Sequence, residues 1–131
     1  MSKLKLNLNN GRVIEFTSSD YKSEEIVVQF NDPNILFTGV GGSIVNKHAI
    51  VSILPTYEER EYIYEYELAL SDGRKEVLKS DEIIDVQDAI ILLNNPNTLF
   101  ISIGGAVVQK HNFQTLLLIN MNEELEENEA V

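Results

Sequence analysis

The stretch GGSIVNKH, from Gly41 to His48, returns as GGAVVQKH, from Gly104 to His111. Both copies lie inside longer matching segments, because residues 31–54 and 94–117 share eleven identities over 24 aligned positions. A repeat of this length is typical of a structural unit that occurs more than once in a chain. The sequence therefore predicts a tandem duplication.

Both copies begin with the pattern of a β-hairpin. Residues 3–9 alternate leucine with polar residues, which is typical of a half-buried strand. NNGR (9–12) follows, and SDGR (71–74) stands at the matching place in the second copy, one residue out of step. Glycine in such a motif supplies the positive φ that tight hairpin turns need. Each copy is thus expected to start with two antiparallel strands.

A helix is expected next in each copy, ending before Pro33 or Pro96. In the second copy we expect Ser80 to cap the helix, with Asp81 and Glu82 in its first turn. The paired glycines then predict a strand–turn–strand hairpin, and a short corner leads to a last strand. The fold class is therefore α+β, mainly β, with a β-β-α-β-β-β unit in each copy. The glycines expected in turns are Gly11, Gly41, Gly42, Gly73, Gly104 and Gly105.

The segments NNGR…ILFTGVGGSIVNKHAIVSIL and SDGR…LFISIGGAVVQKHNFQTLLLI resemble, as patterns, small five-stranded barrels of the SH3 or Sm type. The resemblance implies a small barrel or half-barrel in each copy, although neither family usually has a helix between its second and third strands. The ending GGSIVNKHAIVSILP and the Asn-, Ile- and Glu-rich composition also resemble small phage and prophage proteins of AT-rich Gram-positive bacteria. That likeness implies an accessory protein of a phage or mobile element.

The repeat divides the chain into a first unit, residues 1–56, a second unit, 57–120, and an acidic flexible tail, 121–131. Little sequence separates the two units, and a unit of about 60 residues is only marginally stable alone. We therefore expect the units to pack on each other with pseudo-twofold symmetry, as two subunits do in an isologous dimer.

Composition limits the classes of function. The chain has no cysteine, which excludes disulfides and zinc–thiolate sites, and no long apolar run that predicts a membrane span. We expect a cytoplasmic protein. The net charge is -11; residues 57–120 hold eleven acidic and five basic residues, and residues 121–131 add five glutamates. An acidic surface without a basic stripe favours a basic protein partner over direct contact with nucleic acid.

Residues able to carry chemistry are few. His48 and His111 occupy matching places, so they could form a paired metal or proton-transfer site, or each could hydrogen-bond a backbone carbonyl at a corner. A metal site would need further ligands, which the motif does not supply. Lys47 and Lys110 are either anion-binding groups or solvated corner residues. We expect no enzyme activity, no cofactor and no metal.

The segment YEEREYIYEYE, from Tyr57 to Glu67, contains four of the five tyrosines and five glutamates. Exposed tyrosines would offer the rigid amphipathic area common at interaction hot spots. Alternatively, the tyrosines cover the core and the glutamates keep an edge strand from pairing with other chains. The candidate partner-binding residues are Tyr57, Glu58, Glu61, Tyr62, Tyr64, Glu65, Tyr66 and Glu67.

These observations favour a non-catalytic protein-interaction protein that binds a basic protein, for example as an inhibitor of a nucleic-acid-binding host protein. The alternative is a structural or assembly subunit of a virion or complex, which would use pseudo-symmetric β edges and make the chain a homo-oligomer. A small barrel that binds nucleic acid is a third hypothesis, which the lack of basic residues among the aromatic ones disfavours.

Overall fold

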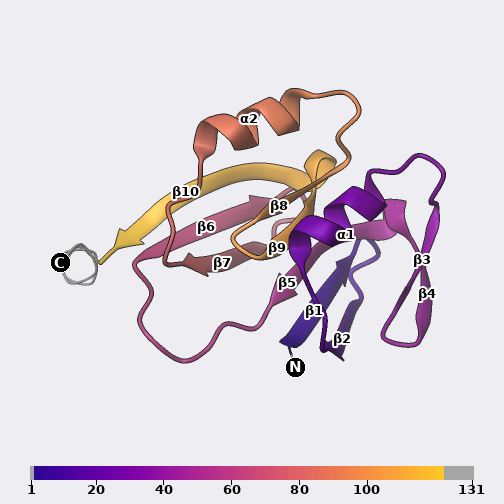
Figure 1. Cartoon of the computed structure of the whole chain (residues 1–131), viewed down its shortest axis with the longest axis horizontal. Coiled ribbons are helices and arrows are strands. Elements are labelled where there is room, and N and C mark those ends of the chain that lie inside the picture. Colours follow the sequence, from indigo (N-terminus) through magenta and orange to yellow (C-terminus); the bar gives the residue numbers. More distant parts are fainter. Residues whose placement is uncertain (1, 123–131) are drawn as a thin grey trace.

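The computed structural model describes residues 2–122 and shows a mainly β protein with antiparallel sheets and two α-helices (Figure 1). The element order is the same in both halves. The first half contains β1 (Ser2–Leu8), β2 (Val13–Ser18), α1 (Ser23–Phe30), β3 (Phe37–Val40), β4 (Ser43–Asn46), a 3₁₀ turn η1 (Lys47–Ala49) and β5 (Ile50–Pro55). The second contains β6 (Tyr64–Leu70), β7 (Lys75–Ser80), α2 (Val86–Asn94), β8 (Phe100–Ile103), β9 (Ala106–Gln109), η2 (Lys110–Asn112) and β10 (Phe113–Met121).

The diglycine turns have nearly identical backbones in the two halves. Gly41 and Gly42 have φ of 55° and 80°, and Gly104 and Gly105 have 58° and 80°. Two consecutive positive φ angles define the turn whose twist suits a two-residue hairpin loop. The expected hairpins, β3–β4 and β8–β9, are confirmed. Gly11 and Gly73 also have positive φ, in the turns that follow β1 and β6.

The corners after the hairpins are also held in the same way. Lys47 Nζ donates to the Asp32 carbonyl, and Lys110 Nζ donates to the Asn95 carbonyl, each at 2.8 Å. The lysines therefore tie each 3₁₀ turn to the loop after the preceding helix.

One helix start differs from the expectation. Ser80 is the last residue of β7 and does not cap α2, because its hydroxyl is engaged in a local turn with Glu82. The cap is Asp85, whose side chain accepts a hydrogen bond from the Asp88 backbone N–H. The acidic run thus contains the cap, but five residues later than the sequence pattern indicates.

The two halves share a sheet. Five strands lie in the order β2-β1-β5-β9-β8, so the last strand of the first half pairs with the hairpin of the second. The register matches Ser52 with Val108 and Ile53 with Val107. The other strands form a three-stranded sheet, β10-β6-β7, and the isolated hairpin β3-β4.

This pairing corrects the expected pseudo-twofold packing. A twofold axis would also pair β10 with β4, whereas β10 pairs only with β6 among the described strands. The contact between the halves therefore joins two different surfaces. Neither half closes into a barrel within residues 2–122, and the half-barrel alternative stays a prediction.

The core is also shared between the halves. One cluster of buried residues combines β1, β5 and Phe30 of α1 with Phe100 and Val107 from the second half. The other combines β6 and β7 with Val51 and Leu54 from the first half. Burial of apolar surface from both halves on β5, β8 and β9 thus stabilises their association.

Candidate interaction surface

The tyrosines of the predicted partner-binding segment are mostly buried. Tyr62, Tyr64 and Tyr66 expose only 8%, 7% and 3% of their surface. The Tyr66 hydroxyl accepts a hydrogen bond from the Ile84 N–H at 3.1 Å, which ties β6 to the segment before α2. The exposed tyrosine face on which the interaction hypothesis depends is therefore not present at these three residues.

Arg60 organises the segment between the halves. Its Nη2 lies 2.7 Å from Asp81 Oδ2, and its guanidinium lies 3.8 Å from the centre of the Tyr62 ring. Asp81 also accepts a hydrogen bond from the Ile63 N–H. The Arg60 hydrogen bond holds the pKa of Asp81 below its usual range, and Asp81 in turn raises the pKa of Arg60. Arg60, the basic residue of this acidic segment, thus makes its contacts within the fold.

Two tyrosine hydroxyls hold the second diglycine turn. Tyr57 donates to the Gly104 carbonyl and Tyr21 donates to the Gly105 carbonyl, each at 2.6 Å. Burial raises the pKa of Tyr57 to about 12 and that of Tyr21 above its usual range. Both phenols therefore stay protonated as donors further into the alkaline range than an exposed tyrosine does. Because Tyr21 precedes α1 and Tyr57 follows β5, they anchor the first half and the connecting segment to the second half.

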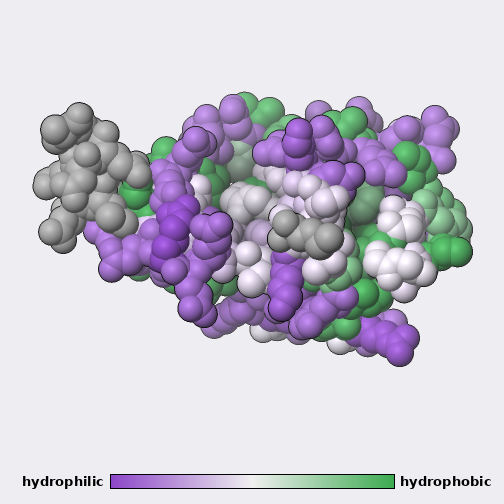
Figure 2. Space-filling view, turned by 60° about the horizontal axis from the view of Figure 1, so that its bottom comes forward, coloured by the Kyte–Doolittle hydropathy of each residue, from purple (hydrophilic) through white to green (hydrophobic). Residues whose placement is uncertain are grey.

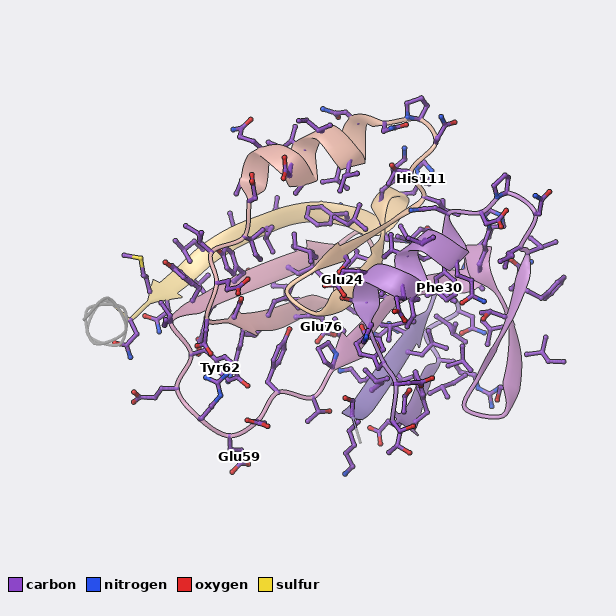
Figure 3. The ribbon with its side chains drawn as sticks, viewed as in Figure 1. Glu24, Phe30, Glu59, Tyr62, Glu76 and His111 are labelled. Carbon is purple, nitrogen blue, oxygen red and sulfur yellow. The ribbon has the colours of Figure 1, made fainter. Side chains whose placement is uncertain are left out.

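The glutamates of the segment are more accessible. Glu58 and Glu61 are exposed, whereas Glu65 and Glu67 on β6 are half-buried. Glu59 points away from the body of the protein on the connecting loop (Figure 3). Binding of a basic partner by the glutamates stays a prediction, and the accessible charge lies on the loop before β6.

His48 and His111 occupy the same position in η1 and η2. The His48 backbone carbonyl accepts a hydrogen bond from Gln109 Nε2 at 3.3 Å, across the contact between the halves. No group of three or more potential metal-ligating side chains occurs in the described part of the chain. The same part contains no helix long and apolar enough to span a membrane.

A groove with a volume of about 650 Å³ lies between β1, β2, β7 and the end of β5. Its charged residues have both signs, and Lys5 and Glu76 approach to 3.7 Å. The groove therefore has no strong charge bias for a ligand.

Exposed apolar side chains gather on elements that the sequence reasoning did not single out. They include Leu117, Leu118, Ile119 and Met121 on β10, exposed by 40–52%, and Phe37 and Ile44 on the β3–β4 hairpin, exposed by 59% and 84%. Hydrophobic atoms are visible at the right end of the molecule in Figure 2, the end where Figure 1 places β3 and β4. The available signal was the run LLLI (116–119), which is apolar on both faces of its strand.

The equivalent elements of the shared sheet are covered. β5, the counterpart of β10, is almost entirely buried, and so is β9, the counterpart of β4. Side chains buried in one half are thus exposed in the other. No family model, curated protein or solved structure matches this chain, so the surface is interpreted from its own geometry.

Proposed function

We propose that this chain is a non-catalytic assembly subunit, built by tandem duplication, whose copies associate through β10 and the β3–β4 hairpin. The observation that carries the proposal is the contrast between the buried β5 and the exposed apolar β10. The duplication is supported by the common element order, the matching φ angles of the diglycine turns and the paired Lys47 and Lys110 contacts.

The sheet edges differ in how they discourage association. Edge strands in natural proteins often carry charged residues, because an unpaired apolar edge pairs readily with another chain. The edge strands β2 and β7 contain Glu15, Lys75, Glu76 and Lys79. β10 is a nine-residue edge strand without any charge, and β3 and β4 have none either. The four-residue edge strand β8 is also uncharged, but it is largely buried. Exposed apolar patches of the kind on β10 are typical of interaction sites, which supports the proposal.

Light scattering at increasing protein concentration tests the proposal. We expect particles larger than the 14.8 kDa chain. Leu118→Lys should shift them to monomers, because it places a charge in the proposed contact. Val77→Lys is the matched control, since Val77 on β7 is exposed by 45% and Leu118 by 51%. A wild-type chain that stays monomeric at millimolar concentration contradicts the proposal.

The exposed Glu58 and Glu61 favour a second candidate function, binding of a basic protein surface. On this hypothesis the chain is an accessory factor of a phage or mobile element that inhibits a nucleic-acid-binding host protein. Replacement of both glutamates by lysine should then abolish binding to such a partner and leave self-association unchanged. Binding that survives the replacement excludes this candidate.

A further inference from the structure

We infer that the contact between the two halves is repeated between molecules, with β10 of one copy pairing antiparallel with β4 of the next copy. This inference rests on the proposed assembly function and specifies its partner, a second copy of this chain, and its register. Within the chain, one surface formed by β5 and α1 meets a second surface formed by β8 and β9. Each of these two surfaces has a counterpart in the other half.

The strand orders of the sheets show that the pairing of β10 with β4 is missing within residues 2–122. The complete sheet has the order β2-β1-β5-β9-β8. Shifted by one repeat, the same order reads β7-β6-β10-β4-β3. The three-stranded sheet β7-β6-β10 and the hairpin β4-β3 are the two parts of that strand order. The described part of the chain, residues 2–122, therefore contains one complete five-stranded sheet and the two separate parts of a second.

Exposure supports the same pairing residue by residue. Val107 and Phe100 are fully buried at the contact between the halves, whereas their counterparts Ile44 and Phe37 are exposed by 84% and 59%. Leu54 at the end of β5 is exposed by 6%, and its counterpart Leu117 by 52%. The residues that a second copy would cover are thus the counterparts of those that the contact between the halves covers within the chain.

The register follows from the internal pairing. Ile53 lies opposite Val107 on β5 and β9. Their counterparts, 63 residues away in each case, are Leu116 and Ile44. Leu116 is half-buried against the core of its own half, so Ile44 of a second copy would extend that core, as Val107 extends the core around Ile53.

A side-chain clamp also has an unused counterpart. Asn31, just after α1, accepts hydrogen bonds from the Leu99 and Phe100 N–H groups at 2.8 Å and donates to the Phe100 carbonyl at 3.0 Å. Its counterpart Asn94 is exposed, and the structure gives its side chain no hydrogen bond to any residue of 2–122. In the second copy, Asn94 would meet Leu36 and Phe37, the counterparts of Leu99 and Phe100.

Some polar contacts between the halves have no counterpart. Ser23 and Ser102 share a hydrogen bond of 2.6 Å, and Tyr21 bonds the Gly105 carbonyl. The residues at the corresponding positions of the second half, Val86 and Ile84, are apolar. The contact between molecules would thus be more apolar than the contact between halves, which suits association in water.

The two complementary surfaces cannot meet in one molecule. β3 and β4 lie at one end of the long axis, and β10 runs toward the other (Figure 1). A contact between two different surfaces of the same chain is head-to-tail, and it produces a ring where the rotation closes and a filament where it does not. Each added copy would leave the same two surfaces free for the next.

Disulfide cross-linking tests the register, because the chain contains no cysteine. Directly opposed residues on antiparallel strands have Cα atoms about 4.5–5.5 Å apart, within disulfide range. The variant with Ile44→Cys and Leu116→Cys should form a ladder of covalent oligomers on mild oxidation. A mixture of the two single variants should stop at dimers. The control with Ile44→Cys and Leu118→Cys, two residues out of register, should cross-link at least about tenfold less.

The outcomes separate this inference from the proposed function. Wild-type particles without register-specific cross-links overturn the inference and leave assembly standing. Leu116→Cys cross-linking to itself also overturns it, because that result means that two β10 strands pair symmetrically. A chain that remains monomeric overturns the proposed function itself.

Asn94→Ala gives a second measurement that does not depend on cysteine chemistry. Removal of the clamp should weaken self-association about tenfold, the effect of losing roughly one net hydrogen bond to a buried backbone. Urea unfolding of the dilute variant should match wild type, because the Asn94 side chain has no such contact with residues 2–122. Unchanged association with wild-type folding counts against the inference.

Discussion

The two glycines of the first hairpin turn differ in their surroundings. A Cβ on Gly41 would lie 2.9 Å from Phe16 Cβ, whereas a Cβ on Gly42 would meet no atom of residues 2–122 within 4 Å. Both residues have positive φ, which costs an alanine about 1–2 kcal/mol. We expect Gly42→Ala to lower the free energy of unfolding by that amount and Gly41→Ala to lower it further, as measured by urea denaturation.

The second turn provides the control for this prediction. A Cβ on Gly104 would lie 3.3 Å from Leu78 Cβ, and one on Gly105 would lie 3.6 Å from Pro55 Cγ. Gly104→Ala should therefore lower the free energy of unfolding more than Gly105→Ala does. The difference between these two variants should be smaller than the difference between Gly41→Ala and Gly42→Ala. Equal losses at Gly41 and Gly42 would show that backbone strain alone decides the glycine requirement.

The Tyr57 hydroxyl couples stability to alkaline pH. Burial raises its pKa to about 12 from the ordinary value of 10.0, so the folded state favours the protonated phenol. The resulting stability is complete below pH 10 and is lost as the pH rises toward 12. Tyr57→Phe should cost about 1 kcal/mol at neutral pH, from the lost hydrogen bond to Gly104, and should lose less stability at high pH.

Urea unfolding at neutral pH and at about pH 11 measures both effects, the second pH lying between the two pKa values of the phenol. Tyr21 has a raised pKa as well, so the single variant should keep part of the alkaline loss and a Tyr21→Phe, Tyr57→Phe double variant should keep less. The idea is wrong if Tyr57→Phe and the wild-type chain lose the same stability between the two pH values.

Between elements, the clearest test concerns the end of α1. Asn31 makes three hydrogen bonds to Leu99 and Phe100, and Phe100 is fully buried. Asn31→Ala would leave backbone groups of the second half without these partners, at a cost of about 1–3 kcal/mol. Urea denaturation of dilute protein should show this loss, whereas Asn94→Ala should show almost none. Similar losses in both variants would mean that the contact between the halves does not depend on the clamp.

Local patterns predicted the elements more accurately than their boundaries or partners. The diglycine turns and corners followed from sequence because a positive φ is a local demand that glycine meets at little cost. The predicted start of α2 was wrong because the serine and aspartate residues from Ser80 to Asp85 are all of types that commonly cap helices. Ser80 bonds Glu82 in a turn instead, and only the geometry of the chain after β7 selects Asp85.

For the molecule as a whole, the arrangement of the two halves was beyond prediction from the sequence. Pairing of β5 with β9 joins residues far apart in the chain, and a repeat fits a twofold or a head-to-tail contact equally well. Tyr62, Tyr64 and Tyr66 alternate as a surface strand does, but packing of β6 against the shared core buries Tyr64 and Tyr66. Tyr62 precedes β6 and is buried beside Arg60 and Tyr57. The exposed β10 became recognisable only beside its covered counterpart β5.

Net charge gives the whole molecule a test that separates the two candidate functions. Each copy carries a net charge of -11, so copies repel one another at low ionic strength. Salt shortens the screening length from about 30 Å at 0.01 M to about 3 Å at 1 M, while contacts between apolar strands are not weakened by screening. Sedimentation velocity across that range should therefore show assembly that strengthens with salt.

A complex between the acidic loop and a basic protein would respond in the opposite direction, because its attraction is screened. Urea unfolding of the dilute chain at each salt concentration provides the baseline, since salt also changes the repulsion within one copy. Assembly that dissolves as salt increases would mean that charge pairs, and not the apolar strands β10 and β4, hold the copies together. The strand pairing would then have to be abandoned even if the particles were large.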